Sequence, residues 1–103
     1  GLNAQDALKL VGFVPVEIDN PVPAGAHLMN TGGPVDALHD QGYITSACFS
    51  PNLNCHIGIG FLKAGDKRIG EVVRLVSPLT GQDHSVKVVS AHFVDPEGER
   101  LRA

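Results

Sequence analysis

The sequence predicts an all-β fold, a small antiparallel barrel or sandwich of about six strands. The first observation is that short runs of β-branched and aromatic residues alternate with turns, in a chain of 103 residues with 12 glycines and 7 prolines. The second is that residues 42–62 have the pattern of a tight β-hairpin. A chain of this length forms one domain with a single core.

The predicted hairpin is the most distinctive part of the chain. Residues 42–50 are rich in strand-favouring types and contain no proline or internal glycine, and residues 51–54 supply turn chemistry. The second strand, residues 55–62, is almost wholly apolar and places Gly58 and Gly60 on one face. Glycines in such a strand allow another backbone or a bulky ring to approach closely.

The remaining strands are expected at residues 9–14, 26–29, 71–77 and 85–91, the last ending near Val94. The connecting turns are expected at residues 21–25, 30–34, 63–68 and 80–83, where glycine, proline, asparagine and aspartate cluster. Residues 2–10 fit either a short helix capped at Asn3 or a linker that leads into the first strand.

These patterns divide the chain into residues 1–7, a linker or tag remnant, residues 8–94, the barrel, and residues 95–103, a C-terminal tail. A turn at Asp95–Gly98 is expected to end the barrel, and the charges beyond it are expected to be solvated. Because the chain begins with glycine, we expect a tag remnant or a fragment of a longer protein.

Composition excludes several classes of function. Eight basic and eleven acidic residues give a net charge of −3, without a basic cluster, so a nucleic-acid-binding surface is not expected. No apolar run approaches the length of a membrane span, and no signal segment opens the chain, so we expect a cytoplasmic protein without membrane contact.

The chain contains no convincing catalytic or metal-binding constellation. Cys48 and Cys55 allow either free thiols, which we favour, or one disulfide across the hairpin. Their spacing from the histidines matches no metal-ligand pattern. The chain also contains possible nucleophiles and a possible base, namely Ser46, Cys48, Ser50 and His92. No motif or spacing joins them, so composition alone suggests the set. The acidic and basic run at residues 66–68 is expected to be solvated.

Residues 42–53, followed by Ile57-Gly-Ile-Gly, resemble the C-terminal barrel domain of aminomethyltransferase-type folate enzymes, a family that includes the glycine-cleavage T-protein. The ending, residues 92–102, is similar to the C-terminus of heterotetrameric sarcosine oxidase alpha subunits. The residues that carry the resemblance, expected to be structural or interdomain in role, are Gly42, Thr45, Ser46, Ser50, Pro51, Leu53, Gly58, Gly60, Gly70, Glu71, Asp95, Pro96 and Gly98. Residues 54–56 depart from the family pattern, so an arginine contact made there in relatives is in doubt.

The resemblance implies a fragment of a larger flavoenzyme that oxidatively demethylates sarcosine. The barrel would brace the tetrahydrofolate-binding domain that precedes it, and would contact other sarcosine oxidase subunits or self-associate as a fragment. The parent enzyme would use tetrahydrofolate, FAD, FMN and NAD, whereas this domain would hold no cofactor, metal or catalytic residue. Two alternatives are a stand-alone barrel that binds a small ligand or peptide, and the closing domain of a glycine-cleavage aminomethyltransferase.

Overall fold

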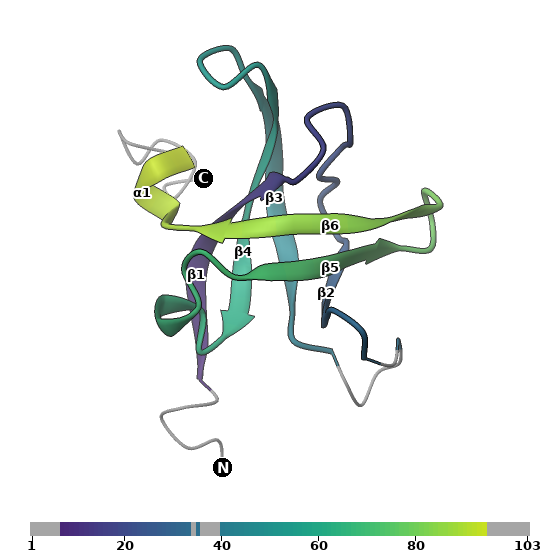
Figure 1. Cartoon of the computed structure of the whole chain (residues 1–103), viewed down its shortest axis with the longest axis vertical. Coiled ribbons are helices and arrows are strands. Elements are labelled where there is room, and N and C mark those ends of the chain that lie inside the picture. Colours follow the sequence, from purple (N-terminus) through teal and green to yellow (C-terminus); the bar gives the residue numbers. More distant parts are fainter. Residues whose placement is uncertain (1–6, 34, 36–39, 95–103) are drawn as a thin grey trace.

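A computed structural model describes residues 7–33, 35 and 40–94 of the chain. Six antiparallel strands close into a barrel in the order β1-β4-β3-β2-β5-β6 (Figure 1), which confirms the predicted fold class. The strands are β1 (Leu8–Pro15), β2 (His27–Asn30), β3 (Gly42–Ser50), β4 (Cys55–Lys63), β5 (Val72–Ser77) and β6 (Gln82–Val89). A 3-10 helix, η2 (Gly65–Lys67), follows β4, and a one-turn helix, α1 (Ala91–Val94), follows β6.

The barrel interior is built by alternation along the strands. Val73 and Leu75 on β5 and Val86 and Val88 on β6 are completely buried, while Lys87 between the last two is exposed. The interior cluster consists of Val11, Phe13, Val22, Ala26, Leu28, Ile44, Leu62, Val73, Leu75, Val86 and Val88. Because the closed sheet has no free edge, all six strands contribute to one core.

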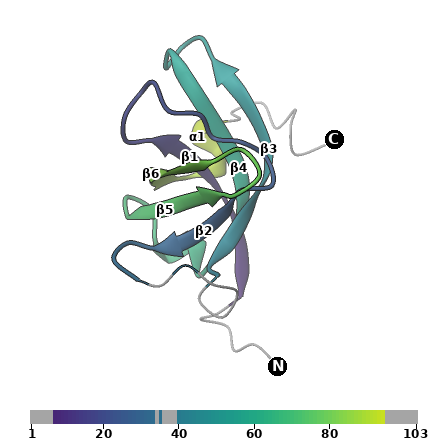
Figure 2. The same cartoon turned by 90° about the vertical axis from the view of Figure 1, so that its right-hand side faces the viewer.

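The central hairpin forms as predicted and carries a β-bulge. The register of β3 against β4 shifts between Ile44 and Ser46, so Thr45 has no partner in the ladder. The Thr45 hydroxyl donates to the Ile59 carbonyl at 3.0 Å. Beyond the bulge, the hairpin extends past the other strands (Figures 1 and 2), and Phe49 stacks edge-on against His56 with ring centroids 5.4 Å apart.

The C-terminal part of the barrel differs from the prediction. The last strand begins at Gln82, not at residue 85, and ends at Val89 rather than near Val94. Helix α1 takes the place of the expected strand end, because the Ser90 hydroxyl accepts a hydrogen bond from the Phe93 amide at 3.1 Å and so caps the helix.

The first strand begins at Leu8, one residue before the start expected at residue 9. The alternative helix at residues 2–10 is wrong over Ala7–Leu10, because Ala7 is not helical and Leu8–Leu10 lie in β1. Its first part, residues 2–6, lies outside the described residues. The predicted tail, residues 95–103, with its turn at Asp95–Gly98, also lies outside them. In the described part of the chain, no helix has the length and apolar character needed to cross a membrane.

Candidate functional site

Most of the residues singled out by the family pattern lie on the β3–β4 hairpin. Gly42, Thr45, Ser46 and Ser50 are on β3, Pro51 and Leu53 are in the turn, and Gly58 and Gly60 are on β4. Gly70 and Glu71 directly precede β5. Asp95, Pro96 and Gly98 lie outside the described residues. The described motif residues therefore lie on the hairpin and on the turn before β5.

The hairpin glycines allow two backbones to approach more closely than side chains permit. A Cβ atom on Gly60 would collide with the Tyr43 carbonyl oxygen, and one on Gly42 would collide with that of Phe61. A Cβ atom on Gly58 would lie 2.6 Å from Val22 Cγ1 in the core. At these three positions an added side chain would therefore meet the neighbouring strand or the core.

The hairpin turn is also held by a motif residue. Ser50 Oγ accepts a hydrogen bond from the Leu53 amide at 3.3 Å. This bond stabilises the turn that ends with Asn54 in the left-handed conformation, φ 55°. The hydroxyl of Ser50 therefore has a structural partner within the turn.

Arg68 forms a clamp at one end of the barrel. Its guanidinium donates to both Glu71 carboxylate oxygens at 2.8 and 3.0 Å. It also donates to Asn30 Oδ1 at 2.8 Å, Gln41 Oε1 at 3.2 Å and the Lys63 carbonyl at 3.3 Å. One side chain thereby connects the end of β2, the residue before β3, the end of β4 and the turn before β5.

The prediction that Arg68 is simply solvated charge is wrong. Its side chain is only 14% exposed, while that of Glu71 is 45% exposed. The hydrogen bond from Arg68, assisted by its charge, lowers the pKa of Glu71 against a smaller opposing effect of burial. The neighbouring Gly70 adopts φ 95°, a conformation that favours glycine, and its amide donates to the Val88 carbonyl at 2.8 Å.

Much of the outer face of strands β1, β4 and β3 is apolar, although the outer face of a small barrel is usually polar and exposed to solvent. Helix α1 covers part of it by placing Val94, 5% exposed, over Ile57 and Ile59 of β4. The helix fits closely because Gly12 on β1 has no side chain, and a Cβ atom there would lie 2.7 Å from Val94 Cγ2. We call this region the covered half of the outer face.

The same face continues beyond α1 as a row of exposed apolar side chains. The strand register opposes Leu10 to Phe61, and Phe61 to Tyr43, so the three share the outer face. The Tyr43 and Phe61 rings lie 5.8 Å apart between centroids. Leu8 lies two residues before Leu10 on the same face. We call Leu8, Leu10, Tyr43 and Phe61 the open row, and the first three are 41%, 36% and 41% exposed.

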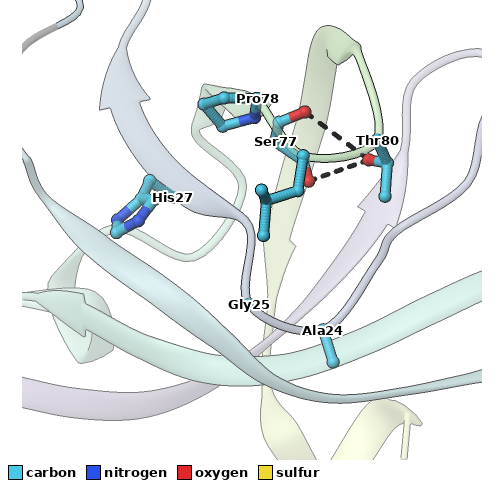
Figure 3. A pocket seen from close by; sticks show the side chains of 7 residues that line it. Ala24, Gly25, His27, Ser77, Pro78 and Thr80 are labelled. Carbon is cyan, nitrogen blue, oxygen red and sulfur yellow. Dashed lines mark hydrogen bonds between the residues drawn. The ribbon is translucent and has the colours of Figure 1, made fainter.

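A separate cavity of about 250 Å³ opens between the start of β2 and the β5–β6 turn (Figure 3). It is lined by Ala24, Gly25, His27, Ser77, Pro78, Leu79 and Thr80. The Thr80 hydroxyl donates to Ser77 Oγ at 2.8 Å, and His27 Nδ1 lies 2.8 Å from Asp40 Oδ2. Because His27 is paired with Val76, it points to the opposite face of the sheet from the buried Ser77. The arrangement does not form an Asp–His–Ser relay.

The histidines of the described region are dispersed. His84 Nε2 lies 2.7 Å from the Pro21 carbonyl, His56 stacks on Phe49, and His92 is exposed on α1. Within residues 7–33, 35 and 40–94, no group of three His, Cys, Asp or Glu side chains is placed to hold a metal ion. In the same residues, every buried polar side-chain atom has a hydrogen-bond partner.

The two cysteines belong to the cluster under α1 and are free. The register opposes Cys48 to Ile57 and Cys55 to Ser50, so they do not face each other across the hairpin. Burial raises the pKa of the Cys55 thiol, which disfavours the reactive thiolate. Ser46 and Cys48 share the outer face with Ile59 and Ile57, so neither is placed beside a base in the ladder.

Sequence reasoning missed both the Arg68 clamp and the open row. The clamp residues are separated by as many as 38 positions, so no local pattern joins them. The row has a weak local signal, because Leu8, Leu10 and Phe61 are apolar at positions that alternate with core residues. An outer face of a barrel with that pattern indicates contact with another surface.

Comparison with known proteins gives consistent results. Residues 9–95 match the model of the glycine cleavage T-protein C-terminal barrel domain. The chain is 34% identical over 101 residues to a sarcosine oxidase subunit alpha of Rhizobium meliloti, covering 98% of this chain and 10% of that protein. It is 34% identical over 98 residues to a sarcosine oxidase subunit alpha of a Corynebacterium species, covering 93% of this chain and 10% of the relative.

The fold also matches a solved structure. The crystal structure of glycine cleavage system aminomethyltransferase T from Bartonella henselae aligns with a TM-score of 0.65 and 26% identity, covering 85% of this chain and 22% of that one. The chain therefore spans about a tenth of the length of the curated relatives it matches. The match over residues 9–95, together with the six-stranded closed barrel, shows that the chain belongs to the glycine cleavage T-protein C-terminal barrel domain family.

Proposed function

We propose that this chain is the C-terminal structural barrel of a sarcosine oxidase alpha subunit. In that role it braces the tetrahydrofolate-binding domain of a folate-dependent flavoenzyme that oxidatively demethylates sarcosine. The observation that carries the proposal is the similarity to sarcosine oxidase alpha subunits, which extends over 98% of this chain but only 10% of the relative. The catalytic groups would then belong to the rest of the polypeptide.

The internal organisation of the barrel supports a bracing role. The Arg68 clamp joins four segments of the chain, and the hairpin glycines bring β3 and β4 into close contact. Among the described residues, hydroxyls such as those of Thr45, Ser50 and Thr80 are engaged in structural hydrogen bonds. Such a barrel supplies rigidity rather than acid, base or nucleophile.

The proposal extends to the longer protein. We propose that the parent chain works in the cytoplasm with other sarcosine oxidase subunits, and that FAD, FMN, NAD and tetrahydrofolate bind outside this barrel. The named motif residues from Gly42 to Gly98 would then act in packing within the barrel or between domains. Residues 54–56 depart from the family pattern, and a buried cysteine, Cys55, stands there in this chain. We therefore propose no arginine contact at this position.

Two alternatives have specific support. The likeness to the Bartonella henselae aminomethyltransferase, with a TM-score of 0.65, favours a closing domain of a glycine-cleavage aminomethyltransferase. The cavity of about 250 Å³ beside Ser77 favours a stand-alone binding module. We prefer the sarcosine oxidase assignment because the sequence identity there is 34%, against 26% for the aminomethyltransferase structure.

The test is a comparison of substrates with the complete polypeptide and its partner subunits. We expect consumption of sarcosine and capture of the one-carbon unit by tetrahydrofolate, and no turnover of an aminomethyl donor. The 103-residue chain alone should turn over neither sarcosine nor an aminomethyl donor with tetrahydrofolate. Turnover proportional to the concentration of this chain alone would refute the non-catalytic assignment, and a complete polypeptide active only on the aminomethyl donor would favour the first alternative.

A further inference from the structure

We infer that the open row, Leu8, Leu10, Tyr43 and Phe61, is the surface on which the preceding part of the same longer polypeptide docks. This inference rests on the proposed function and identifies the face and the partner. The row crosses three neighbouring strands, because Leu10, Phe61 and Tyr43 occupy matching register positions on β1, β4 and β3. It is continuous with the face that α1 already covers.

The covered half shows what kind of surface packs on this face. Helix α1 contributes an aliphatic side chain, Val94, which lies over Gly12, Ile57 and Ile59. The open row has the same apolar chemistry but nothing over it among the described residues, and its members are aromatic or aliphatic. By its chemistry, the complementary surface is apolar, with aliphatic or aromatic side chains that fill the space beside Leu10 and Phe61.

The polar groups near the row refine this description. Lys63 lies opposite Leu8 at the end of β4, so the row has a cation at one border. The Tyr43 hydroxyl makes no hydrogen bond to another described residue, and Tyr43 is 41% exposed. A buried tyrosine normally finds a partner for its hydroxyl. We therefore expect the docking surface to offer one hydrogen-bond acceptor or donor to Tyr43 within an otherwise apolar contact.

The position of the row identifies its occupant. The Ala7 carbonyl accepts a hydrogen bond from the Ala64 amide at 3.0 Å, so the backbone is fixed immediately before Leu8. Any polypeptide joined before Ala7 therefore starts beside the row, and its effective local concentration there is high. The curated relatives place nine tenths of their length outside the region that matches this chain.

A second copy of the chain is a weaker occupant. A stable interface between separate proteins buries about 800 Å² on each partner, on the order of 20 residues a side. The open row provides Leu8, Leu10, Tyr43 and Phe61, which is a small fraction of that number. A covalently joined partner does not lose the translational freedom that two separate chains lose on association, so a small apolar row suffices.

The test is site-directed thiol labelling in two contexts, the 103-residue chain and the complete polypeptide. Leu10→Cys reports on the open row, and Tyr43→Cys is a second reporter if the first variant fails to fold. Val72→Cys is the matched control, because Val72 is 39% exposed against 36% for Leu10 and lies on β5, opposite β4 in the strand order. Labelling rates at each site are measured by mass spectrometry after circular dichroism has confirmed the fold.

The expected result is that Leu10→Cys reacts more slowly in the complete polypeptide by about tenfold or more, because a covered side chain reacts only during local opening. Val72→Cys should react at the same rate in both contexts. Equal labelling of Leu10→Cys in both contexts would overturn the inference. Protection that grows with the concentration of the 103-residue chain alone would also overturn it and would assign the row to a second copy.

These outcomes are separable from those of the proposed function. If Leu10→Cys is freely labelled in a complete polypeptide that converts sarcosine, the docking face is elsewhere and the functional assignment stands. If Leu10→Cys is protected in a complete polypeptide that does not convert sarcosine, the docking face stands and the functional assignment fails.

Discussion

Replacing Arg68 by alanine should destabilise the barrel more than any other removal of a single surface charge in its described part. The bond to Asn30 Oδ1 is 2.8 Å long and contributes about 1 kcal/mol net, and the longer bonds to Gln41 and the Lys63 carbonyl contribute less each. The pair with Glu71 adds only about 0.5 kcal/mol, because Glu71 is 45% exposed and screened by solvent. The free energy of unfolding should therefore fall by about 2–3 kcal/mol in total.

The assay is urea denaturation of the 103-residue chain, followed by circular dichroism and repeated as a thermal melt. A loss of this size lowers Tm by about 10–20 °C in a domain of this length. Arg74→Ala is the matched control, because Arg74 also pairs with a carboxylate, Asp83 at 2.7 Å, but without further partners among the described residues, and it should change stability little. Arg68→Lys keeps the charge without the planar set of donors and should recover only part of the loss. Equal stability of Arg68→Ala and Arg74→Ala would refute the account of the clamp.

Three further predictions concern Gly60, Glu71 and Cys55. Gly60→Ala should lower the free energy of unfolding by about 1–3 kcal/mol, because the added Cβ overpacks against the backbone of β3. Gly33→Ala is the control: its added Cβ has its nearest neighbour at 3.5 Å, so stability should hardly change in the same denaturation assay. Because the folded pKa of Glu71 lies below its ordinary value of 4.5, its contribution to stability is complete above that pH and is lost as the pH falls through the folded pKa. Glu71→Gln should therefore flatten the pH dependence of the melting temperature below about pH 4.5, and an unchanged profile would contradict the pairing. Cys55, which is 7% exposed and has a raised pKa, should be alkylated by iodoacetamide more slowly than Cys48, as mass spectrometry of partly labelled protein can show.

The sequence predicted those parts of the fold that local chemistry determines. The hairpin was predicted because its turn, residues 51–54, and its flanking strands lie in one continuous stretch. The bulge at Thr45 was not predicted, because a bulge depends on how the residues of β3 pair with those of β4. Helix α1 was missed because four residues are too few to show helical periodicity, and it forms only where the Ser90 cap and the packing of Val94 coincide.

The candidate site was less predictable than the fold. The motif glycines were correctly expected to allow close approach, as Gly60 does against Tyr43, because a glycine within a strand commonly marks a bend or a site where another backbone comes near. Arg68 looked like an ordinary surface charge, since its partner Asn30 is 38 residues away. The open row depends on the closure of the barrel, which decides that Leu10 and Tyr43 flank Phe61 on one face.

The central claim is that this barrel braces the domain that precedes it in the longer polypeptide. Differential scanning calorimetry of the complete polypeptide, wild type and Arg68→Ala, tests this claim most directly. If the barrel braces the tetrahydrofolate-binding domain, weakening the clamp should lower the unfolding transition of that domain together with that of the barrel, while the fold of the remaining chain is unchanged at low temperature. Separate melting of the barrel at a lower temperature, with the transition of the preceding domain unmoved, would contradict the account.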